Sequence, residues 1–487
     1  MINPIFFLSS CLGVSQTLIA STIGLATGYM AISKLSEIKK NKLESDDKNT
    51  FSEIKDIEKF LGNNGIKLST NVNLSAKALE EHLIILGPTG CGKTSSLFIP
   101  NLLSRERFNN SNSSLVLTDP KGELHSITSS YQRTLGREIK VFSPYSPLRS
   151  IHYNPLDFCN DESEVIGLAR DILVTGAKAI ELRTNGNSPK DTIWINMATP
   201  LFASALLYCW KLKRPQNTIS NALRLIIDNS DIELNNLLGE HEDDNIRLQY
   251  KMYEKAATSP ATAGSIQVTL TSNAQSFLTP VIEDITAYSD FTFKDLRKNK
   301  TALYLIYDFE KAPDLAPLTA IFYSQLFSEC KKYNRKHDLN IYCLFDEFAN
   351  IGAIPNFNIY SSTLRSYRIS LICALQDKNQ LKNLYGTGAD TIFNNLKHLV
   401  LFGGNKDNET LQSISKLAGV INIKNITKSI NSSGTTTSES FRTKNLLNIS
   451  DLKNINEDEI LIMLKNSKPL LDNQNKYYKN FEYLSKC

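Results

Sequence analysis

The sequence predicts an α/β protein: a mostly parallel sheet with helices on both faces, an all-helical insertion, and an N-terminal membrane-spanning helix. Three observations lead to this prediction. Near-continuous apolar runs alternate with helical stretches, as in parallel sheets that are covered on both faces. A long middle section has helical periodicity only. The first apolar stretch is long enough to cross a bilayer.

The N-terminal stretch predicts a single membrane span. No charged side chain precedes Lys34, and residues 5–32 are mostly apolar, which exceeds the ~20 residues that a helix needs to cross the hydrocarbon core. A cleaved signal peptide would begin with positive charge, whereas the basic residues here follow the apolar stretch. Because positive flanks stay inside, we expect a single-pass anchor over residues 1–33 with cytoplasmic soluble domains. Residues 34–78 are then a juxtamembrane linker and the start of the soluble body.

A glycine-rich loop predicts a nucleotide site. The apolar run Leu83–Leu86 leads directly into G-x-x-x-x-G-K-T over residues 87–94. The glycines permit a backbone in which N–H groups converge on phosphate, and the following helix adds its positive end. Lys93 is expected to meet the β- and γ-phosphates of ATP, and Thr94 to bind Mg²⁺; the alternative is a glycine turn beside an ordinary lysine. The predicted nucleotide-binding residues are Gly87, Pro88, Thr89, Gly90, Cys91, Gly92, Lys93, Thr94 and Ser95.

Two α/β regions enclose the helical one. Strands are expected at residues 115–119, 301–308, 341–345, 369–374 and 399–402. Helices are expected at residues 164–175, 191–210, 219–238 and 245–257. We therefore predict one nucleotide-binding domain, formed by residues 79–160 and 284–487, with an all-α domain inserted over residues 161–283. Polar, Ser- and Asn-rich composition predicts a surface loop at 105–114 and a flexible loop at 429–440.

Adjacent carboxylates end one of the expected strands. Asp346 and Glu347 follow strand 341–345, at the sheet edge where α/β proteins bind their ligands. We expect Asp346 to hold Mg²⁺ together with Thr94, and Glu347 to polarise the attacking water. An Asp-Glu pair at an ordinary strand end is the alternative. Asp119 ends another strand and is a competing metal ligand, ranked second because no carboxylate is adjacent to it.

Two more polar residues flank strand 369–374. Gln376 follows the strand, so its amide is expected at the same sheet edge, where it could sense the γ-phosphate or orient water. Arg365 precedes the strand, and a guanidinium there could stabilise charge on the phosphoryl group of a neighbouring subunit. On the residues alone, an ordinary surface arginine is the preferred interpretation of Arg365.

Composition gives little support for nucleic acid. The 54 basic and 50 acidic residues leave a net charge of +4, so any DNA contact must be local. Lys331, Lys332, Arg335 and Lys336 cluster, but a solvated helix end explains them equally well. The eight cysteines form no C-x-x-C pair and indicate neither a metal site nor a disulfide framework. The signatures of ABC transporters and of H-E-x-x-H metalloproteases do not occur.

Several motifs together resemble the VirD4/TraG family, the type IV secretion coupling proteins of bacterial conjugation. The resemblance covers nearly all of residues 79–487, and the order of the motifs makes it specific. They are Gly87-Pro-Thr-Gly-Cys-Gly-Lys-Thr94, Asp119-Pro-Lys-Gly-Glu123, Tyr153-Asn-Pro-Leu156, Asp191-Thr-Ile-Trp194, Leu344-Phe-Asp-Glu-Phe348, the run Arg365 to Gln376, Asn394-Asn-Leu-Lys397 and Asn408-Glu-Thr410.

The resemblance implies a RecA-like P-loop domain interrupted by an all-α domain, assembled as a homo-hexamer on the inner face of the plasma membrane. It implies an ATPase that recruits relaxase-bound DNA and drives the transfer strand through the secretion channel, with relaxosome proteins and channel components as partners. Arg365 resembles the position of a trans-acting finger, and Gln376 that of a nucleotide-sensing glutamine. Many members carry two N-terminal spans where this sequence has one, and Cys91 stands where Ser or Ala is more usual.

Two alternatives stay open at this point. The same ATPase could deliver protein effectors instead of DNA. A protein of another class, a docking receptor gated by nucleotide, would do no work. Glu347 separates a motor from a receptor, because a nucleotide switch needs no general base.

Overall fold

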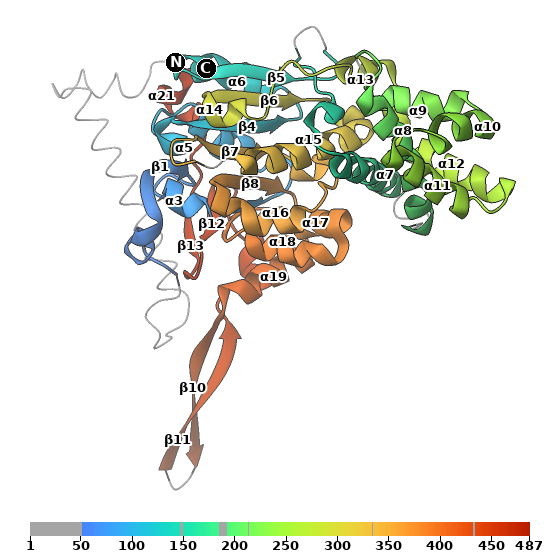
Figure 1. Cartoon of the computed structure of the whole chain (residues 1–487). Coiled ribbons are helices and arrows are strands. Elements are labelled where there is room, and N and C mark those ends of the chain that lie inside the picture. The colour runs from blue at the N-terminus through green and yellow to red at the C-terminus, as the bar shows by residue number, and fades with distance from the viewer. Residues whose placement is uncertain (1–50, 147–149, 185–191, 213, 334, 432–433) are drawn as a thin grey trace. The chain divides into compact units, whose positions relative to one another are not determined.

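The computed structural model describes residues 51–146, 150–184, 192–212, 214–333, 335–431 and 434–487 (Figure 1). The predicted anchor over residues 1–33 lies outside the described residues. The chain divides into two units, one formed by Phe51–Gly419 with Asn445–Cys487, the other containing Val420–Lys444. The larger unit carries every predicted site residue.

A nine-stranded mixed sheet forms the centre of the larger unit (Figure 1). Its strand order is β13-β12-β9-β3-β8-β7-β4-β6-β5. The strands are β3 (Leu83–Leu86), β4 (Ser113–Asp119), β5 (Glu138–Phe142), β6 (Thr301–Ile306), β7 (Asn340–Phe345), β8 (Ile369–Leu375), β9 (His398–Phe402), β12 (Glu459–Met463) and β13 (Leu470–Asn473). Neighbours from β9 to β5 are parallel, whereas β12 is antiparallel to both β9 and β13. The α/β class and the mostly parallel sheet are confirmed.

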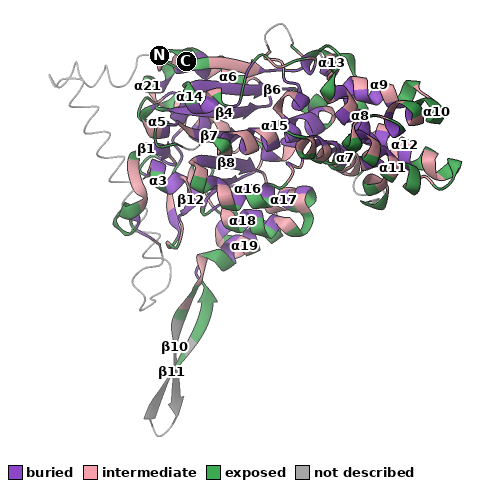
Figure 2. Ribbon diagram, in the orientation of Figure 1, coloured by how far each residue is buried: buried purple, intermediate pink, exposed green. Residues whose placement is uncertain are grey.

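The apolar runs that predicted strands are the interior of this unit. Every residue of β3, β4, β8 and β9 is buried, and the strands stand out as the buried layer in Figure 2. Helices cover the sheet, which is why these four strands have no polar face. The helices of the α/β part are α3 (Ala76–Leu79), α4 (Ile99–Leu102), α5 (Arg107–Asn110), α6 (Glu123–Thr134), α14 (Asp295–Lys298), α15 (Ala312–Lys332), α16 (Phe357–Thr363), α17 (Lys378–Tyr385), α18 (Ala389–Asn395), α19 (Asn408–Ala418), α20 (Ile449–Lys453) and α21 (Phe481–Leu484).

The described residues between 161 and 285 are helices and turns only, as predicted, although the limits of the inserted domain stay a prediction. The α-helices are α7 (Glu162–Arg183), α8 (Thr192–Lys211), α9 (Ile219–Asp228), α10 (Asp231–Leu234), α11 (Asp244–Ala256), α12 (Pro260–Ala274) and α13 (Pro280–Ile285). The helix predicted over 219–238 is divided, because Ser230 and Glu233 form a capping box that starts a new helix. Among the described helices, α8 alone has the length and apolarity of a membrane span, but it packs against α7, α9, α11 and α12.

Two local predictions are wrong. The described residues of 429–440, expected as a flexible loop, belong to two paired strands, β10 (Val420–Asn431) and β11 (Gly434–Asn445). The threonines that suggested a loop are β-branched and suit strands equally well. Residues 105–114, expected as a surface loop, are partly interior, since Arg107 is 7% and Phe108 1% exposed. The Arg107 guanidinium donates to the Asn63 carbonyl at 2.9 Å, which ties this segment to β1 (Leu61–Lys67).

Candidate active site

The phosphate loop lies at the carboxyl edge of the sheet, directly after β3. Gly90 has φ +81° and Gly92 φ +99°, a left-handed backbone that glycine adopts without steric cost. At Gly87 the reason is space, because an added Cβ would lie 2.7 Å from both Cys91 Sγ and Phe402 Cβ. The loop continues into a π-helical turn, Thr94–Phe98, and then α4. The predicted nucleotide-binding residues therefore form one contiguous, sterically constrained loop.

Lys93 is folded back onto this loop. The side chain is 5% exposed, and its ammonium donates to the Gly87 carbonyl at 2.6 Å and the Pro88 carbonyl at 3.1 Å. These bonds satisfy a buried charge that would be costly without partners. They also hold the cation inside the loop, within reach of an anion that binds there.

Thr94 and Asp346 bring two oxygens together at the start of the helix. Thr94 Oγ1 donates to Asp346 Oδ2 at 2.7 Å, although the two residues are 252 positions apart. Asp346 is 8% exposed, and burial raises the pKa of its carboxyl to about 7, with Glu347 adding to the rise and the Thr94 hydrogen bond opposing it. A buried carboxylate that ionises this reluctantly gains much from a cation beside it. The pair therefore fits the oxygen-seeking Mg²⁺, which keeps several waters of its own.

Asp119, the competing metal ligand, is committed elsewhere. It is 2% exposed, and its Oδ2 accepts the His125 N–H at 2.7 Å, at the start of α6. Burial raises the pKa of Asp119 to about 6, against the backbone hydrogen bonds from α6. Because β4 and β7 are neighbours, Asp119 lies one strand from Asp346 and adds to its raised pKa. Among the described residues no three His, Cys, Asp or Glu side chains converge as metal ligands.

Glu347 and Gln376 face each other at the same edge. Gln376 Nε2 lies 3.5 Å from Glu347 Oε2, a contact long enough to be weak. The Glu347 backbone is left-handed, with φ +66° and ψ +61°, which costs a residue with a Cβ about 1–2 kcal/mol. Strain of this kind concentrates at functional sites. The structure thus brings Lys93, Thr94, Asp346, Glu347 and Gln376 to one edge, as expected.

Asn405 and Tyr307 also belong to this edge and were not predicted. Asn405 is 4% exposed, and its Nδ2 donates to the Gln376 carbonyl at 3.0 Å, which ties the end of β8 to the loop after β9. Its signal was the polar run 403–408 after an apolar strand. Tyr307 follows β6 and is 4% exposed, and its hydroxyl has no hydrogen-bond partner among the described residues. An aromatic residue after a strand carries no such signal.

Arg365 lies far from this site within its own chain. Its Nη1 contacts Glu81 Oε1 at 2.6 Å, and Lys465 Nζ contacts the same oxygen at 2.9 Å. Because β3 and β8 are parallel, residues that precede them lie at the amino edge of the sheet, opposite the phosphate loop. The Arg365 side chain is 47% exposed. A role toward another protomer stays a prediction, and a role in its own nucleotide site is not supported.

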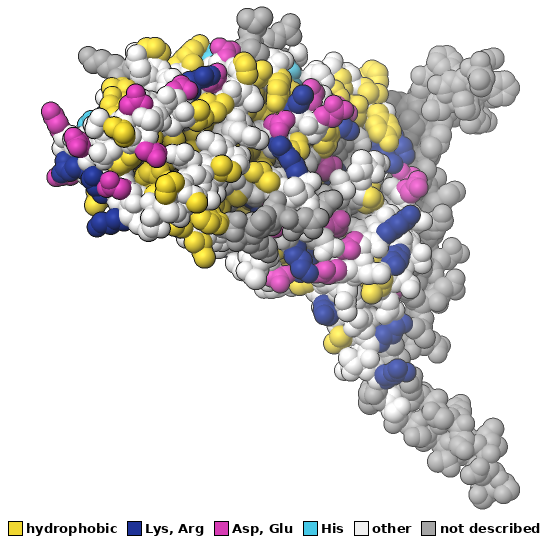
Figure 3. All heavy atoms as spheres, turned by 90° about the vertical axis from the view of Figure 1, so that its right-hand side faces the viewer, with side chains coloured by type: hydrophobic (Ala, Val, Ile, Leu, Met, Phe, Trp, Pro, Cys, Tyr) yellow, Lys and Arg dark blue, Asp and Glu magenta, His cyan; other side chains and the backbone are white. Residues whose placement is uncertain are grey.

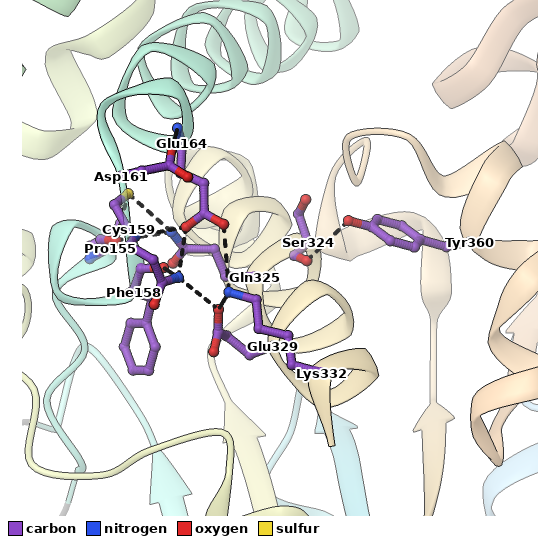
Figure 4. Close-up of polar contacts among 11 residues, drawn as sticks. Pro155, Phe158, Cys159, Asp161, Glu164, Ser324, Gln325, Glu329, Lys332 and Tyr360 are labelled. Atoms are coloured by element: carbon purple, nitrogen blue, oxygen red, sulfur yellow. Dashed lines mark hydrogen bonds and ion pairs between the residues drawn. The ribbon is translucent and has the colours of Figure 1, made fainter. Parts of the chain in front are cut away.

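The basic cluster at the end of α15 is partly engaged within the chain. Lys332 Nζ lies 2.5 Å from Glu329 Oε1 and 3.5 Å from Glu164 Oε1, so it joins α15 to α7 (Figure 4). Lys331 lies over the ring of Tyr360, with Nζ 4.9 Å from the centroid. Charges of both signs are interspersed on the face that the helical segment presents (Figure 3). These contacts explain Lys331 and Lys332 without DNA.

Comparisons with known proteins agree on one group. A sequence model of the family described as "Type IV secretory system Conjugative DNA transfer" matches residues 31–487. Protein VirD4 of Rhizobium radiobacter is 24% identical over 357 residues, 71% of this chain and 49% of that protein. The conjugal transfer protein TraG of Escherichia coli is 24% identical over 388 residues, 74% of this chain and 58% of that protein. The chain thus spans about half the length of these relatives.

A solved structure shares the fold. The plasmid coupling protein TrwB, in complex with ADP and Mg²⁺, superposes with a TM-score of 0.60 at 17% identity. The match covers 86% of this chain and 90% of that chain. An α/β fold with a large mixed sheet is therefore common to both proteins.

Proposed function

The chain belongs to the type IV secretory system conjugative DNA transfer family, and on that premise we propose that it is a coupling ATPase for conjugation. In this proposal it binds ATP and Mg²⁺ and uses hydrolysis to drive relaxase-bound DNA through a type IV secretion system. One observation carries the proposal. A phosphate loop, a part-buried Thr94–Asp346 oxygen pair and a Glu347–Gln376 pair meet at one sheet edge.

Lys93 acts in binding and in hydrolysis. Its ammonium donates hydrogen bonds to two loop carbonyls. When ATP binds, phosphate oxygens replace these carbonyls as acceptors. A charge-assisted bond to phosphate is stronger than a bond to a neutral carbonyl, so the exchange favours binding. TrwB was solved with ADP and Mg²⁺, which supports an adenine nucleotide and Mg²⁺ as the ligands of this site.

Thr94 and Asp346 hold the metal in this proposal. When bound, Mg²⁺ supplies positive charge beside the β- and γ-phosphates. Asp346 must be ionised to serve, and its raised pKa means that the cation and the proton compete for it near neutral pH.

Glu347 and Gln376 handle water. The Glu347 carboxylate accepts a hydrogen bond from the attacking water and takes a proton from it. The Gln376 amide orients this water and senses the γ-phosphate. Their 3.5 Å contact is weak, so both groups are free to turn to a water between them. The Gln376 backbone is held by Gln380 and Asn405, which supports its positioning.

Arg365 serves the site of a neighbouring protomer, as expected for a homo-hexamer. Two observations support this role. Arg365 lies at the sheet edge opposite its own phosphate loop, and about half of its side chain is exposed and so accessible to another molecule. A guanidinium in trans stabilises charge on the transferred phosphoryl group.

The assembly belongs to the plasma (inner) membrane, anchored once by residues 1–33, with the rest of the chain in the cytoplasm. Residues 79–160 and 284–487 are its RecA-like domain and residues 161–283 its all-α domain. Its partners are DNA, relaxosome proteins and secretion channel components. Because charges of both signs are interspersed on the helical face, the DNA contacts of this proposal are local and not spread over a basic field (Figure 3).

The test is ATP hydrolysis by the full chain with and without DNA. Lys93→Ala is expected to lose ATP binding, and Glu347→Gln to bind ATP but turn over poorly. DNA is expected to stimulate turnover at low salt and much less at high salt, because phosphate contacts release counterions. Parental turnover in Glu347→Gln would contradict the assignment of Glu347 as the general base. No stimulation by DNA at low salt would favour the docking receptor. If DNA did not change the rate of ATP hydrolysis and crosslinking captured a protein cargo, effector export would be favoured.

A further inference from the structure

The end of the chain reaches the phosphate loop. After β13 the backbone of Gln474 donates to the Asp458 carbonyl at 2.8 Å, and the residue is 7% exposed. Its side chain lies against the loop between Cys91 and Ser96, although Gln474 is 383 positions from Cys91 in the sequence.

The Gln474 amide uses both of its polar atoms on this loop. Nε2 donates to the Cys91 carbonyl at 3.2 Å and to the Glu457 carbonyl at 2.7 Å, and Oε1 accepts from Ser96 Oγ at 2.7 Å. The contact is close enough that a Cβ on Gly92 would lie 2.9 Å from Gln474 Oε1. One buried amide therefore joins the loop, the turn that follows it and the hairpin of β12 and β13.

The Cys91 carbonyl and the Gly92 N–H belong to the same peptide unit. In a planar trans peptide these two groups point in opposite directions. Because the Cys91 carbonyl is directed at Gln474, the Gly92 N–H of the same peptide points away from Gln474. Backbone N–H groups of such a loop are the groups that meet phosphate oxygens. Gly92 at φ +99° has no side chain that would fix this orientation by itself.

We infer that Gln474 is a positioning residue for the phosphate loop, which aims the Gly92 N–H at the β-phosphate of the nucleotide. The inference rests on the proposed ATP site and deepens it. A glycine-rich loop must lose backbone freedom to bind an anion, and an amide that fixes one peptide in advance reduces that entropic cost. Nucleotide affinity thereby depends on the correct docking of the C-terminal hairpin.

The experiment titrates the full chain with fluorescent ATP and ADP analogues and measures KM and kcat. Gln474→Ala is expected to weaken both nucleotides by the same factor, about tenfold, since one phosphate-directed bond is misaimed and both nucleotides carry the β-phosphate. KM is expected to rise more than kcat falls, because the bond is present before and during hydrolysis. A merely structural defect would lower active protein without this equal shift in affinity.

Asn475→Ala is the matched control. Asn475 is also 7% exposed, but its Nδ2 donates to Tyr483 Oη at 3.4 Å and not to a carbonyl of the loop. This variant is expected to keep the parental affinity. Parental affinity in Gln474→Ala, or an equal loss in both variants, would overturn the inference.

Three further outcomes are decisive. If Gln474→Ala does not fold, Ser96→Ala removes only the hydroxyl bonded to Oε1; about threefold weaker binding is expected, and parental binding would overturn the inference. If the parent chain itself binds no ATP, the proposed function fails and the inference with it. If the parent binds and the variants match it, the inference alone fails.

Discussion

Asp346→Asn is predicted to stabilise the nucleotide-free protein above neutral pH while it abolishes ATP hydrolysis. Burial raises the pKa of Asp346 from its ordinary 3.8 to about 7. At about 1.36 kcal/mol per pKa unit, ionising this buried carboxyl costs the folded protein roughly 4 kcal/mol at pH 8, as an order of magnitude. Asparagine carries no charge, and its Oδ1 can still accept the hydroxyl of Thr94.

The pH dependence distinguishes this reason from a general change in packing. Between about pH 3.8 and 7 the folded protein holds a proton on Asp346 that the unfolded chain has released. The parent's free energy of unfolding therefore falls as pH rises through this window and levels off above it, whereas the variant lacks this component. From pH 5 to pH 8 the variant is expected to gain about 2–3 kcal/mol on the parent.

The assay is urea unfolding of both full-length proteins at pH 5 and pH 8 without nucleotide. Saturating ATP and Mg²⁺ should narrow the difference at pH 8, because the metal stabilises the ionised carboxylate of the parent only. If the difference in free energy of unfolding between variant and parent were the same at pH 5 and pH 8, the assignment of a raised pKa to Asp346 would be refuted. Hydrolysis at the parental rate by the variant would refute its role as a metal ligand.

Three other predictions concern residues around the sheet. Arg365→Ala is expected to lower steady-state hydrolysis by the oligomer about 10³-fold with little change in ATP affinity. Arg105→Ala, a control at an exposed position, should leave hydrolysis unchanged. If mixing of subunits restored no activity to Arg365→Ala, action in trans would be contradicted. Burial lowers the pKa of His82 to about 3, with the His398 charge adding to the effect. The unfolded chain thus binds a proton that the fold excludes, the parent's free energy of unfolding falls as pH drops from 6.5 toward 3, and His82→Asn should flatten that slope in acid unfolding. Maleimide on Cys91, whose pKa burial raises, should block ATP binding slowly at pH 7 and faster at pH 9. Cys91→Ser should be protected, and equal inactivation of it would show that another thiol is responsible.

The strands that the sequence predicted are buried at all or all but one of their positions. β8 and β9 are apolar at nearly every position because helices cover both of their faces. β5 escaped because it is an edge strand on which Glu138 and Lys140 alternate with apolar residues and remain partly exposed. The hairpin of β10 and β11 escaped because a polar, threonine-rich stretch is compatible with either a loop or a strand.

The site divides in the same way. Lys93 and Thr94 were predictable because their chemistry is fixed by a contiguous motif, and Asp346 because it ends a recognisable strand. Gln474 gave no signal, since its meaning depends on a carbonyl 383 positions away that only the folded chain brings near. A residue that acts through tertiary contact alone cannot be inferred from local pattern.

The contacts at the amino edge of the sheet explain how the Arg365 guanidinium can leave its ion pair with Glu81 at low cost in free energy. The Glu81 side chain is 11% exposed. If Arg365 were its only cation, the loss of that cation would leave a largely buried carboxylate unpaired, which is strongly destabilising. Glu81, however, has two cations: burial favours its neutral form, but the Lys465 hydrogen bond and Arg365 together hold its pKa below the usual value. Lys465 Nζ lies 2.9 Å from the same Glu81 oxygen, so this carboxylate keeps one cation if the Arg365 guanidinium turns away. The guanidinium is therefore retained in the free protomer and still available to a neighbouring phosphate, which is what a finger shared between protomers requires.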